Sequence, residues 1–560
     1  MNCNFQKDNL PAVLLQSIIL LILALFLVGA LAPPALAGPP GHGHSRMMAL
    51  PPVQTRTWKQ MEAGALTAGS GAITPAPGQV PFRPTINSGL YRAAKTLAMT
   101  RSFEALARSP VGEALGLLAP SPVPPRIKFY NFEGVNYNLA GRLLPPDTHG
   151  AAGANHFVQI TNSHLDIYAK NIYHRKVKSI SLANFFGWTQ SGLFDPRVVY
   201  DADPAYGGRW IISADSFADP KTTGQHHWLA VSAGRNPLGA YYIYAIPVSD
   251  GSAFWDFPQL GVNVNAIVLT ANIYTSAGEG GAFTNSSVLV IPKAQVYAGS
   301  PPPVIFTRID ATINDPSLAP AIVLDTNTDM FLASAPPPPP GTPRTQVNLY
   351  TLDTSDVNNP TLSAALPIDV GYYELPPDAA QYGAPGVLLD TLDCRFVNAS
   401  TQLGNSLWQA HTINDGSGFA RCRYYEFDTS GGTAPIDSGV FYRSPTSFNF
   451  NVSIAANPSR AVFVTWSATD PLRRVQAEVR FSGRRNGDPS GIASPGYLLA
   501  GSLYYYNPSG PPGEGATVTE RWGDYSAVTI DPGNSNFAWI VNERVLSKGV
   551  WSSRIGRIGY

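Results

Sequence analysis

Charge and histidine are scarce in this chain of 560 residues. Charged side chains make up only 14%, 38 Lys and Arg balance 38 Asp and Glu, and there are nine histidines. Without a basic surplus, neither nucleic acid nor an anionic membrane is expected as the main partner. So few charges also argue against a coiled coil, while 44% apolar residues are too many for a disordered chain.

Cysteine is scarcer still, with Cys3 near the N-terminus and only Cys394 and Cys422 in the body of the chain. An oxidising compartment would permit one disulfide between the last two. They fall on expected strands that another strand separates, which places them farther apart than a disulfide spans. The sequence leaves this bridge open. Two cysteines without paired histidines at ligand spacing do not form a zinc site.

Several catalytic signatures are absent. The chain contains no Gly-x-Ser-x-Gly, no phosphate-binding loop ending in Lys-Ser or Lys-Thr, and no His-Glu-x-x-His. Their absence removes the sequence support for an α/β-hydrolase elbow, a nucleotide-binding loop and a zinc protease.

An apolar run from Ile18 to Leu31 is the longest of the chain. Lys7 precedes it and Ala35-Leu36-Ala37 follows it, which is the pattern of a secretory signal with a small-x-small cleavage site. A membrane anchor is the alternative, but Pro11 and Pro33-Pro34 interrupt or bound the run. We expect residues 1–37 to be removed and the mature protein to be secreted, extracellular or periplasmic, without stable membrane insertion.

Residues 38–127 differ in composition from the remainder. Gly, Pro and Ala dominate 38–53 and 72–84, which predicts a flexible or extended spacer. Apolar residues between Ser88 and Leu118 recur at helical spacing and predict one or two short helices inside it. We therefore divide the chain into 1–37, a spacer at 38–127 and a folded domain at 128–560.

The folded domain reads as short strands separated by turns. With 51 Gly, 51 Pro and 11% aromatic residues, its segments are rich in Val, Ile, Tyr, Phe and Trp. The strands fall into groups, of which residues 197–246 show four members clearly. Four consecutive antiparallel strands per repeat predict an all-β, seven-bladed β-propeller, with six or eight blades as alternatives. The groups open near Asp147, Asp195, Asp256, Asp315, Asp390, Ser444 and Asp524.

A propeller closes its ring by pairing the last strands with residues near its start. We expect residues 537–541 and 551–558 to pair with material near 128–135.

Ordered motifs give the domain a family resemblance. They are PPDTHGAAG at 145–153, HFVQ at 156–159, RW at 209–210, WDFP at 255–258, LW at 407–408, RWGDYS at 521–526, and Asp393 with Arg395. Together they resemble a group of secreted bacterial propeller proteins of largely unknown function. The resemblance covers about residues 130–560 and implies an exported, propeller-like protein without an assigned reaction. The chain departs from the pattern at His149, where a residue such as Asn is expected, and at Cys394.

The recurring Asp residues are the main site candidates, because the first strand of each blade lines the central channel. Carboxylates converging at one mouth would need compensation, either from Ca²⁺ or from arginine. Capping of each Asp's own turn is the alternative. The candidate residues at this channel mouth are Asp147, Asp195, Arg197, Asp256, Asp393, Arg395, Arg521, Asp524 and Tyr525.

Two functions follow from this pattern. The first is a secreted binding protein for an extracellular glycan or protein, since exposed aromatic side chains stack on sugars and peptides. The second is a glycan-active hydrolase, which would use two of the carboxylates across a scissile bond and an arginine cluster. The repeated Ser-x-Asp-x-Gly-x-x-Trp box of sialidases is absent. A mainly structural role is the remaining alternative.

Overall fold

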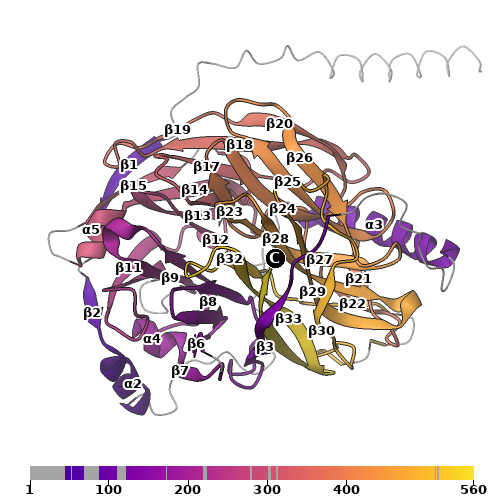
Figure 1. The fold of residues 1–560 in the computed structure, drawn as a ribbon, viewed down its shortest axis with the longest axis horizontal. Coiled ribbons are helices and arrows are strands. Elements are labelled where there is room, and N and C mark those ends of the chain that lie inside the picture. The colour runs from indigo at the N-terminus through magenta and orange to yellow at the C-terminus, as the bar shows by residue number, and fades with distance from the viewer. Residues whose placement is uncertain are drawn as a thin grey trace, which may run out of the picture. The chain divides into compact units, whose positions relative to one another are not determined.

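Strands are the predominant secondary structure of the protein in this computed structural model, with a few helices at its periphery (Figure 1). The all-β fold class is therefore confirmed. The residues taken as a secretory signal lie outside the described part. Within the described part, no helix is both long and apolar enough to cross a membrane. The structure describes residues 44–51, 53–67, 88–109, 122–171, 173–218, 223–277, 281–299, 304–310, 313–510, 512–513 and 516–560.

The strands pair in seven successive antiparallel groups of four. In six groups the chain runs through the four strands in order, and the seventh takes its fourth strand from near residue 130. The first strands of the groups are β4 (His149–Ala152), β8 (Leu193–Asp201), β12 (Phe254–Val262), β16 (Ala319–Val323), β23 (Ser400–Leu403), β27 (Phe448–Ala456) and β32 (Ala527–Ile530).

The remaining strands complete these groups in turn. Group 1 adds β5 (His156–Thr161), β6 (His164–Ala169) and β7 (Lys176–Ser181); group 2 adds β9 (Arg209–Ser216), β10 (Gln225–Ser232) and β11 (Tyr241–Ser249); group 3 adds β13 (Ala266–Tyr274), β14 (Phe283–Pro292) and β15 (Ile305–Asp310). Group 4 adds β17 (Asp329–Ser334), β18 (Arg344–Asp353) and β20 (Leu366–Tyr373), with the short β19 (Thr361–Leu362) also on β18; group 5 adds β24 (Ser406–Asn414), β25 (Ala420–Asp428) and β26 (Pro435–Phe441). Group 6 adds β28 (Val462–Asp470), β29 (Val475–Arg484) and β30 (Tyr497–Ala500); group 7 adds β33 (Phe537–Ser547), β34 (Val550–Gly559) and β3 (Arg126–Asn136).

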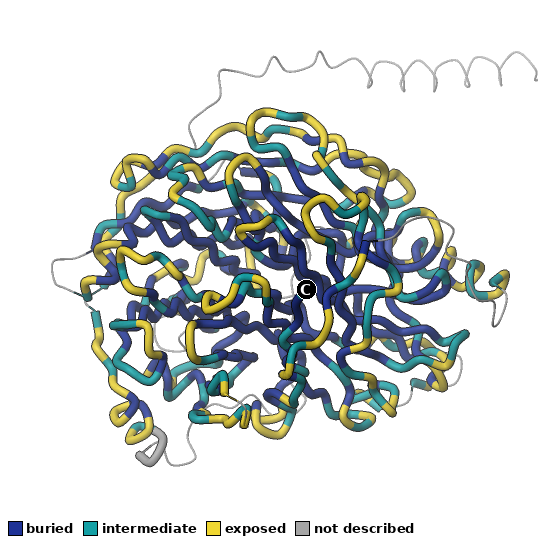
Figure 2. The backbone as a smooth tube through the Cα atoms, viewed as in Figure 1, coloured by how far each residue is buried: buried dark blue, intermediate teal, exposed yellow. Residues whose placement is uncertain are grey.

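The first strands contact one another in a closed order. β4 contacts β8, and the contacts continue through β12, β16, β23, β27 and β32, which returns to β4. Figure 1 shows the groups arranged around a common centre, and Figure 2 shows that the backbone near this centre is buried while the periphery is exposed. Every group therefore contributes its first strand to the same axis.

The hydrophobic core lies between the faces of neighbouring groups. One cluster joins Ile211 and Leu229 of group 2 to Ile267 and Leu289 of group 3. Strands such as β13 and β28 are buried along their whole length, because both faces pack against another sheet. This explains why the sequence of β13 is a nearly continuous apolar run, without the alternation of a half-exposed strand.

The two ends of the folded region meet in group 7. β3 pairs antiparallel with β34, placing Arg126 opposite Gly559 and Asn136 opposite Ser552. The expected pairing of residues near 128–135 with residues 551–558 is confirmed, whereas residues 537–541 pair with β32 and β34 instead of with β3. The pairing covers the edge that β34 would otherwise expose.

The described residues of the expected spacer are not an extended linker but add elements to the outside of the ring. β1 (His44–Ala49) extends group 3 by pairing with β15, and β2 (Gln54–Arg56) extends group 2 by pairing with β11. The helix α2 (Trp58–Thr67) buries Trp58, whose indole N–H donates to the carbonyl of Pro237 at 2.8 Å. These elements gain order from contacts with distant strands, which local composition does not register.

The helix expected after Ser88 is present as α3 (Ser88–Arg108). Its buried Lys95 donates to Asp378 Oδ1 at 2.6 Å. Both Cys394 and Cys422 are buried free thiols, so the disulfide that the sequence left open does not form. The remaining elements are α4 (Leu182–Phe186), α5 (Lys293–Ala298), the 3₁₀ turns η1 (Pro204–Tyr206) and η2 (Pro471–Arg473), and a small sheet of β21 (Ala379–Ala380), β22 (Val387–Leu389) and β31 (Val518–Glu520).

Candidate functional site

A repeated backbone irregularity marks the start of most first strands. One residue there adopts a left-handed φ: 46° at Asp147, 50° at Asp195, 59° at Phe257, 54° at Ser317 and 51° at Asn451. Three of these positions coincide with register shifts in the strand pairing, between Phe194 and Arg197, Asp256 and Gln259, and Phe450 and Ser453. Such bulges re-aim side chains, here near the axis of the ring.

In some groups, the residue with the left-handed φ is not the residue that the sequence marked as the start of the group. In group 3 it is Phe257 rather than Asp256, and in group 6 it is Asn451 rather than Ser444. Asp315 does not join the other carboxyl groups, because its Oδ2 accepts from Asn348 Nδ2 and from the Tyr350 hydroxyl within group 4.

Hydrogen bonds connect the carboxyl groups of groups 1, 2 and 7. Asp147 Oδ1 accepts from the Asp524 N–H at 2.7 Å, and its Oδ2 accepts from Asn162 Nδ2 at 2.6 Å. Asn162 Oδ1 in turn accepts from the Asp195 N–H at 2.9 Å, and the Tyr525 hydroxyl donates to Asp195 Oδ2 at 2.8 Å. Asn162, which sequence reasoning missed, is the link between two of the predicted aspartates.

The three predicted arginines bind in different ways. Arg395 forms a bidentate pair with Asp393, at 2.7 and 2.6 Å, and Arg521 reaches Asp524 at 3.1 Å. Arg197 is bound by backbone carbonyls instead of by Asp195.

Arg197 donates to the carbonyls of Pro258 at 2.9 Å and Val397 at 3.1 Å, and its guanidinium lies 3.4 Å from the centre of the Tyr525 ring. Because groups 2 and 5 are not neighbours in the ring, the Arg197 side chain crosses the axis.

All nine predicted site residues lie in this one region, which we call the polar plate. We define it as Asp147, Asn162, Asp195, Arg197, Asp256, Asp393, Arg395, Arg521, Asp524 and Tyr525. Except for the partly exposed Arg521, every member is buried. The predicted residues therefore come together, but they lie inside the protein and not at an open mouth.

Burial dominates the electrostatics of the polar plate. It raises the pKa of Asp147 well above the ordinary aspartate range, and the carboxyl groups of Asp524 and Asp195 raise it further. Burial likewise raises the pKa of Asp195, with Asp256 and Asp524 adding to the effect. The fold thus favours the protonated forms of these two groups.

Little space remains beside the polar plate. One cavity, lined by Asp147, Asp195, Asp256 and Asp524 among others, measures about 20 Å³, and another, near Asp393, about 10 Å³. A single water needs about 10–15 Å³. Among the described residues, no group of three or more His, Cys, Asp or Glu side chains is placed to hold a metal ion.

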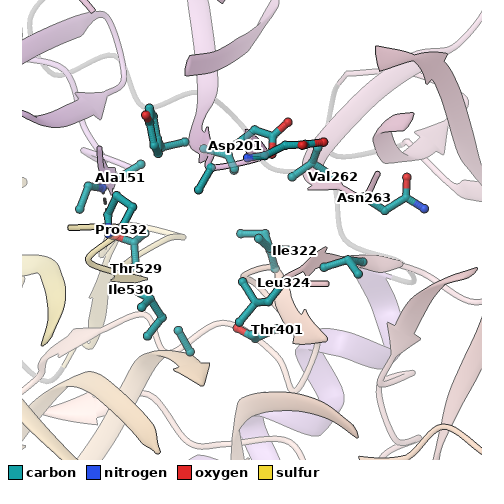
Figure 3. A pocket seen from close by; sticks show the side chains of 18 of the residues that line it. Ala151, Asp201, Val262, Asn263, Ile322, Leu324, Thr401, Thr529, Ile530 and Pro532 are labelled. Carbon is teal, nitrogen blue, oxygen red and sulfur yellow. Dashed lines mark hydrogen bonds between the residues drawn. The ribbon is translucent and has the colours of Figure 1, made fainter. Parts of the chain in front are cut away.

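A much larger cavity of about 720 Å³ occupies the axis of the ring, and we call it the channel. All seven first strands contribute to its lining. Its walls are aliphatic: Figure 3 shows Ile322 and Leu324 on one side facing Ile530 and Thr529 on another, with Val262 nearby. The channel is of the size that holds drug-sized ligands. Sequence reasoning missed this cavity as a site, because its lining comes from seven separate strands and the sequence of no single strand indicates it.

The two ends of the channel differ. One mouth of the channel lies where the first strands end. It is rimmed by Asp and Asn residues whose side chains cap the turns at these strand ends. The capping oxygen accepts a backbone N–H at 3.1 Å for Asp201, 3.0 Å for Asn263, 3.0 Å for Asp325, 2.8 Å for Asn457 and 2.9 Å for Asp531. The turn-capping role considered for the strand starts is found there at Asp390 and Asp393, which accept from the N–H groups of Leu392 at 2.8 Å and Arg395 at 3.0 Å, and it recurs at the strand ends. An Asx-x-Asx pattern at 201–203, 263–265 and 325–327 could have revealed it.

The other end borders the polar plate. Here the buried side chains of Phe257, Leu392, Val397 and Tyr525 pack together, and Arg197 crosses the axis beside them. The channel residues Val198 and Asn398 directly follow Arg197 and Val397 in sequence. The polar plate therefore closes the channel at this end, while the opposite mouth carries the charged turns.

No family model and no curated protein matches this sequence. Among solved structures, Trypanosoma rangeli sialidase in complex with sialic acid aligns with 70% of this chain and 56% of its own, at 11% identity and a TM-score of 0.34. A protein of unknown function from Dyadobacter fermentans aligns with 66% of this chain and 95% of its own, at 9% identity and a TM-score of 0.33. A glycosyl hydrolase from Bacteroides ovatus gives 11% identity and a TM-score of 0.27, over 55% of this chain and 87% of its own. Scores this low transfer neither fold nor activity to this chain.

Proposed function

We propose that this protein binds a small molecule with an apolar body in the channel. The supporting observation is the mainly aliphatic lining of a cavity of about 720 Å³ on the axis of the ring. Water in such a channel gains few hydrogen bonds from the walls, so a ligand that replaces it buries apolar surface at about 25 cal/mol per Å². A ligand of drug size would bury enough surface for micromolar affinity.

We also infer that the scaffold is a seven-bladed β-propeller, with each antiparallel group as one blade. The order of pairing and the closed sequence of contacts among the seven first strands support this inference. In that fold a channel on the axis is a direct consequence of the ring. Export, inferred from residues 1–37, would place the binding function outside the cytoplasm.

The ligand class differs from the glycan or protein first considered. Sugar binding relies on aromatic faces and on many hydrogen-bonding groups. Tyr200 is the one Phe, Tyr or Trp among the described residues that line the channel. An aliphatic wall favours an alkyl or other apolar body over a sugar ring.

Glycan hydrolysis is the second candidate. The observation in its favour is the contact between Tyr525 and Asp195, a carboxyl group kept protonated by its raised pKa, as a general acid must be. A cavity of about 20 Å³ holds about one water, so a sugar could reach these groups only if the polar plate opened. Release of reducing sugar from a polysaccharide, lost in Asp195→Asn, would favour this candidate over simple binding.

The binding function is tested with N-phenyl-1-naphthylamine, a neutral apolar fluorophore. The protein should bind it saturably at one site per chain. Ile322→Asp places a charge in the channel wall that the probe must desolvate, and should weaken binding at least about tenfold. Fluorescence titration gives both affinities.

Ile436→Asp is the matched control, because Ile436 is 57% exposed on β26 and does not line the channel. Its affinity for the fluorophore should stay within about twofold of that of the unchanged protein. No saturable binding by the unchanged protein, or equal weakening in both variants, would contradict the proposed function.

A further inference from the structure

Polar side chains interrupt the aliphatic walls of the channel at several points. The side chains of His149, Ser453 and Thr529 line the channel, and each already accepts a hydrogen bond from a backbone N–H. His149 Nδ1 accepts from Val198 at 3.3 Å, Ser453 Oγ from Val528 at 3.1 Å, and Thr529 Oγ1 from Ala152 at 3.1 Å.

These bonds determine what the three side chains can still offer. An imidazole whose Nδ1 accepts carries its proton on Nε2, and Nε2 is then a donor. The hydroxyl groups of Ser453 and Thr529 likewise retain their protons for donation. Three donors therefore remain on side chains along the channel, with His149 at the end that borders the polar plate and Thr529 two residues before Asp531 at the opposite mouth.

Charge is distributed unevenly along the channel. The carboxylates among the lining residues are Asp201, Asp203, Asp325 and Asp531, and each lies at the end of a first strand or shortly after it. Lys293 binds Asp201 and Asp203 at that mouth, at 3.1 and 2.8 Å. His149, by contrast, is the first residue of β4 and lies at the end of the channel that borders the polar plate.

His149 stays neutral in this setting. Burial lowers the pKa of His149 well below its usual range, and the nearby guanidinium of Arg197 lowers it further. A neutral imidazole beside a fixed guanidinium favours a ligand group rich in electron pairs over a cation. The departure from the family pattern at position 149 thus lies at this end of the channel.

We infer that the channel binds its ligand head first, with a terminal oxygen acceptor, a carbonyl or carboxylate, at His149 and an apolar chain along the aliphatic walls. This inference rests on the proposed function and names its ligand class. The Nε2 donor of His149 recognises the oxygen head, while the aliphatic side chains of the walls, among them Val262 and Ile530, receive the chain. The head of an alkylammonium of equal length carries only hydrogen-bond donors. It would face a donor of the protein, and two donors form no hydrogen bond.

The experiment compares three ligands with the same ten-carbon chain: decanoate, methyl decanoate and decylammonium. Each displaces N-phenyl-1-naphthylamine from the full-length protein at pH 7. At least one of the two oxygen-headed ligands should bind about tenfold or more tightly than decylammonium. Preference for decanoate indicates a carboxylate head, and preference for the ester indicates a neutral carbonyl head.

His149→Phe removes the Nε2 donor and should reduce this preference to about twofold or less. His149→Gln restores an acceptor and a donor, and should recover most of the preference even if His149→Phe is poorly folded. His156→Phe, on β5 and outside the channel lining, is the control and should keep the full preference.

The outcomes separate this inference from the proposed function. If the unchanged protein does not bind the neutral fluorophore, the proposed function fails. If it binds the fluorophore but decylammonium binds as tightly as both oxygen-headed ligands, or if His149→Phe leaves the preference unchanged while the protein remains folded, the head-first inference alone is overturned.

Discussion

Asp195 illustrates how the fold acts on a single residue. Its carboxyl group is buried, accepts a hydrogen bond from Tyr525 and faces the carboxyl groups of Asp256 and Asp524. Its pKa is therefore higher in the folded protein than in the unfolded chain. The folded state then binds more protons than the unfolded state between the two pKa values, so stability falls as pH rises through this window.

Asp195→Asn should remove this dependence, because an asparagine oxygen can still accept from Tyr525 and carries no charge. We expect the unchanged protein to lose stability between pH 5 and pH 8, and the variant to lose less. At pH 8 the variant should be more stable by at least about 1 kcal/mol. Thermal unfolding at both pH values measures the difference.

The control for this prediction is Asp356→Asn, since Asp356 is exposed and caps the Asn358 N–H at 3.1 Å, a bond that asparagine can also make. Its pH dependence should match that of the unchanged protein. Equal behaviour of the two variants would show that Asp195 is not held protonated.

Single residues also show where sequence reasoning succeeded and failed. The recurring Asp near strand starts correctly singled out side chains that share the polar plate. It could not predict that Arg197 would bind backbone carbonyls of distant groups, or that Asn162 would link Asp147 to Asp195. The contacts of Arg197 and the bond between Asn162 and Asp195 join different groups, so their distances depend on how the ring closes, while the bond between Asn162 and Asp147 lies within group 1.

At the scale of elements, α3 shows how tertiary contacts hold a helix in position although the sequence around it is of low complexity. Lys95 lies on its buried face and bonds to Asp378, to the Thr391 hydroxyl at 3.0 Å and to the Pro376 carbonyl at 3.1 Å. Burial raises the pKa of Asp378, and Lys95 opposes that rise. The ion pair thus ties the helix to the chain that leads into group 5.

Lys95→Met should leave the Asp378 carboxyl group buried without its cation. We expect a loss of about 3 kcal/mol in the free energy of unfolding, measured by urea denaturation. Arg92→Met, an exposed substitution on the same helix, should change it by less than about 0.5 kcal/mol. Adding Asp378→Asn to Lys95→Met should recover part of the loss. No loss in Lys95→Met would mean that α3 does not depend on this pair.

The strands β1 and β2 are too short and too locally undistinguished to be expected from sequence. β2 has three residues, and its partner β11 lies far along the chain. Each gains its hydrogen bonds by completing the outer edge of an existing sheet. The sheet must exist before such a strand has a conformation to adopt, so local propensity carries little information about it.

For the whole molecule, the pairing of β3 with β34 is the decisive closure. A chain of residues 138–560 lacks β3 and leaves the ten-residue β34 as an open edge, which favours association between molecules. We expect this chain to aggregate, while a chain of residues 122–560 keeps β3 and remains monomeric with cooperative unfolding. Size-exclusion chromatography and thermal unfolding compare the two.

The same pair of chains separates closure from the outer elements. Both lack β1, β2, α2 and α3, so any defect of those elements affects both equally. If the shorter chain were as soluble and as cooperative as the longer one, β3 would not close the ring.

Composition and local pattern by themselves determined the all-β class, the strand groups, the pairing of the chain's two ends and nine of the ten residues in the polar plate. These features follow from propensity, turn residues and repetition, which act over a few neighbouring residues. The tertiary structure alone decided that the polar plate is buried and includes Asn162 but not Asp315, that the described parts of residues 38–127 pack on the ring and that the channel is mainly aliphatic. Each of these depends on which side chains of seven separate strands meet at one axis, and no local stretch of sequence holds that information.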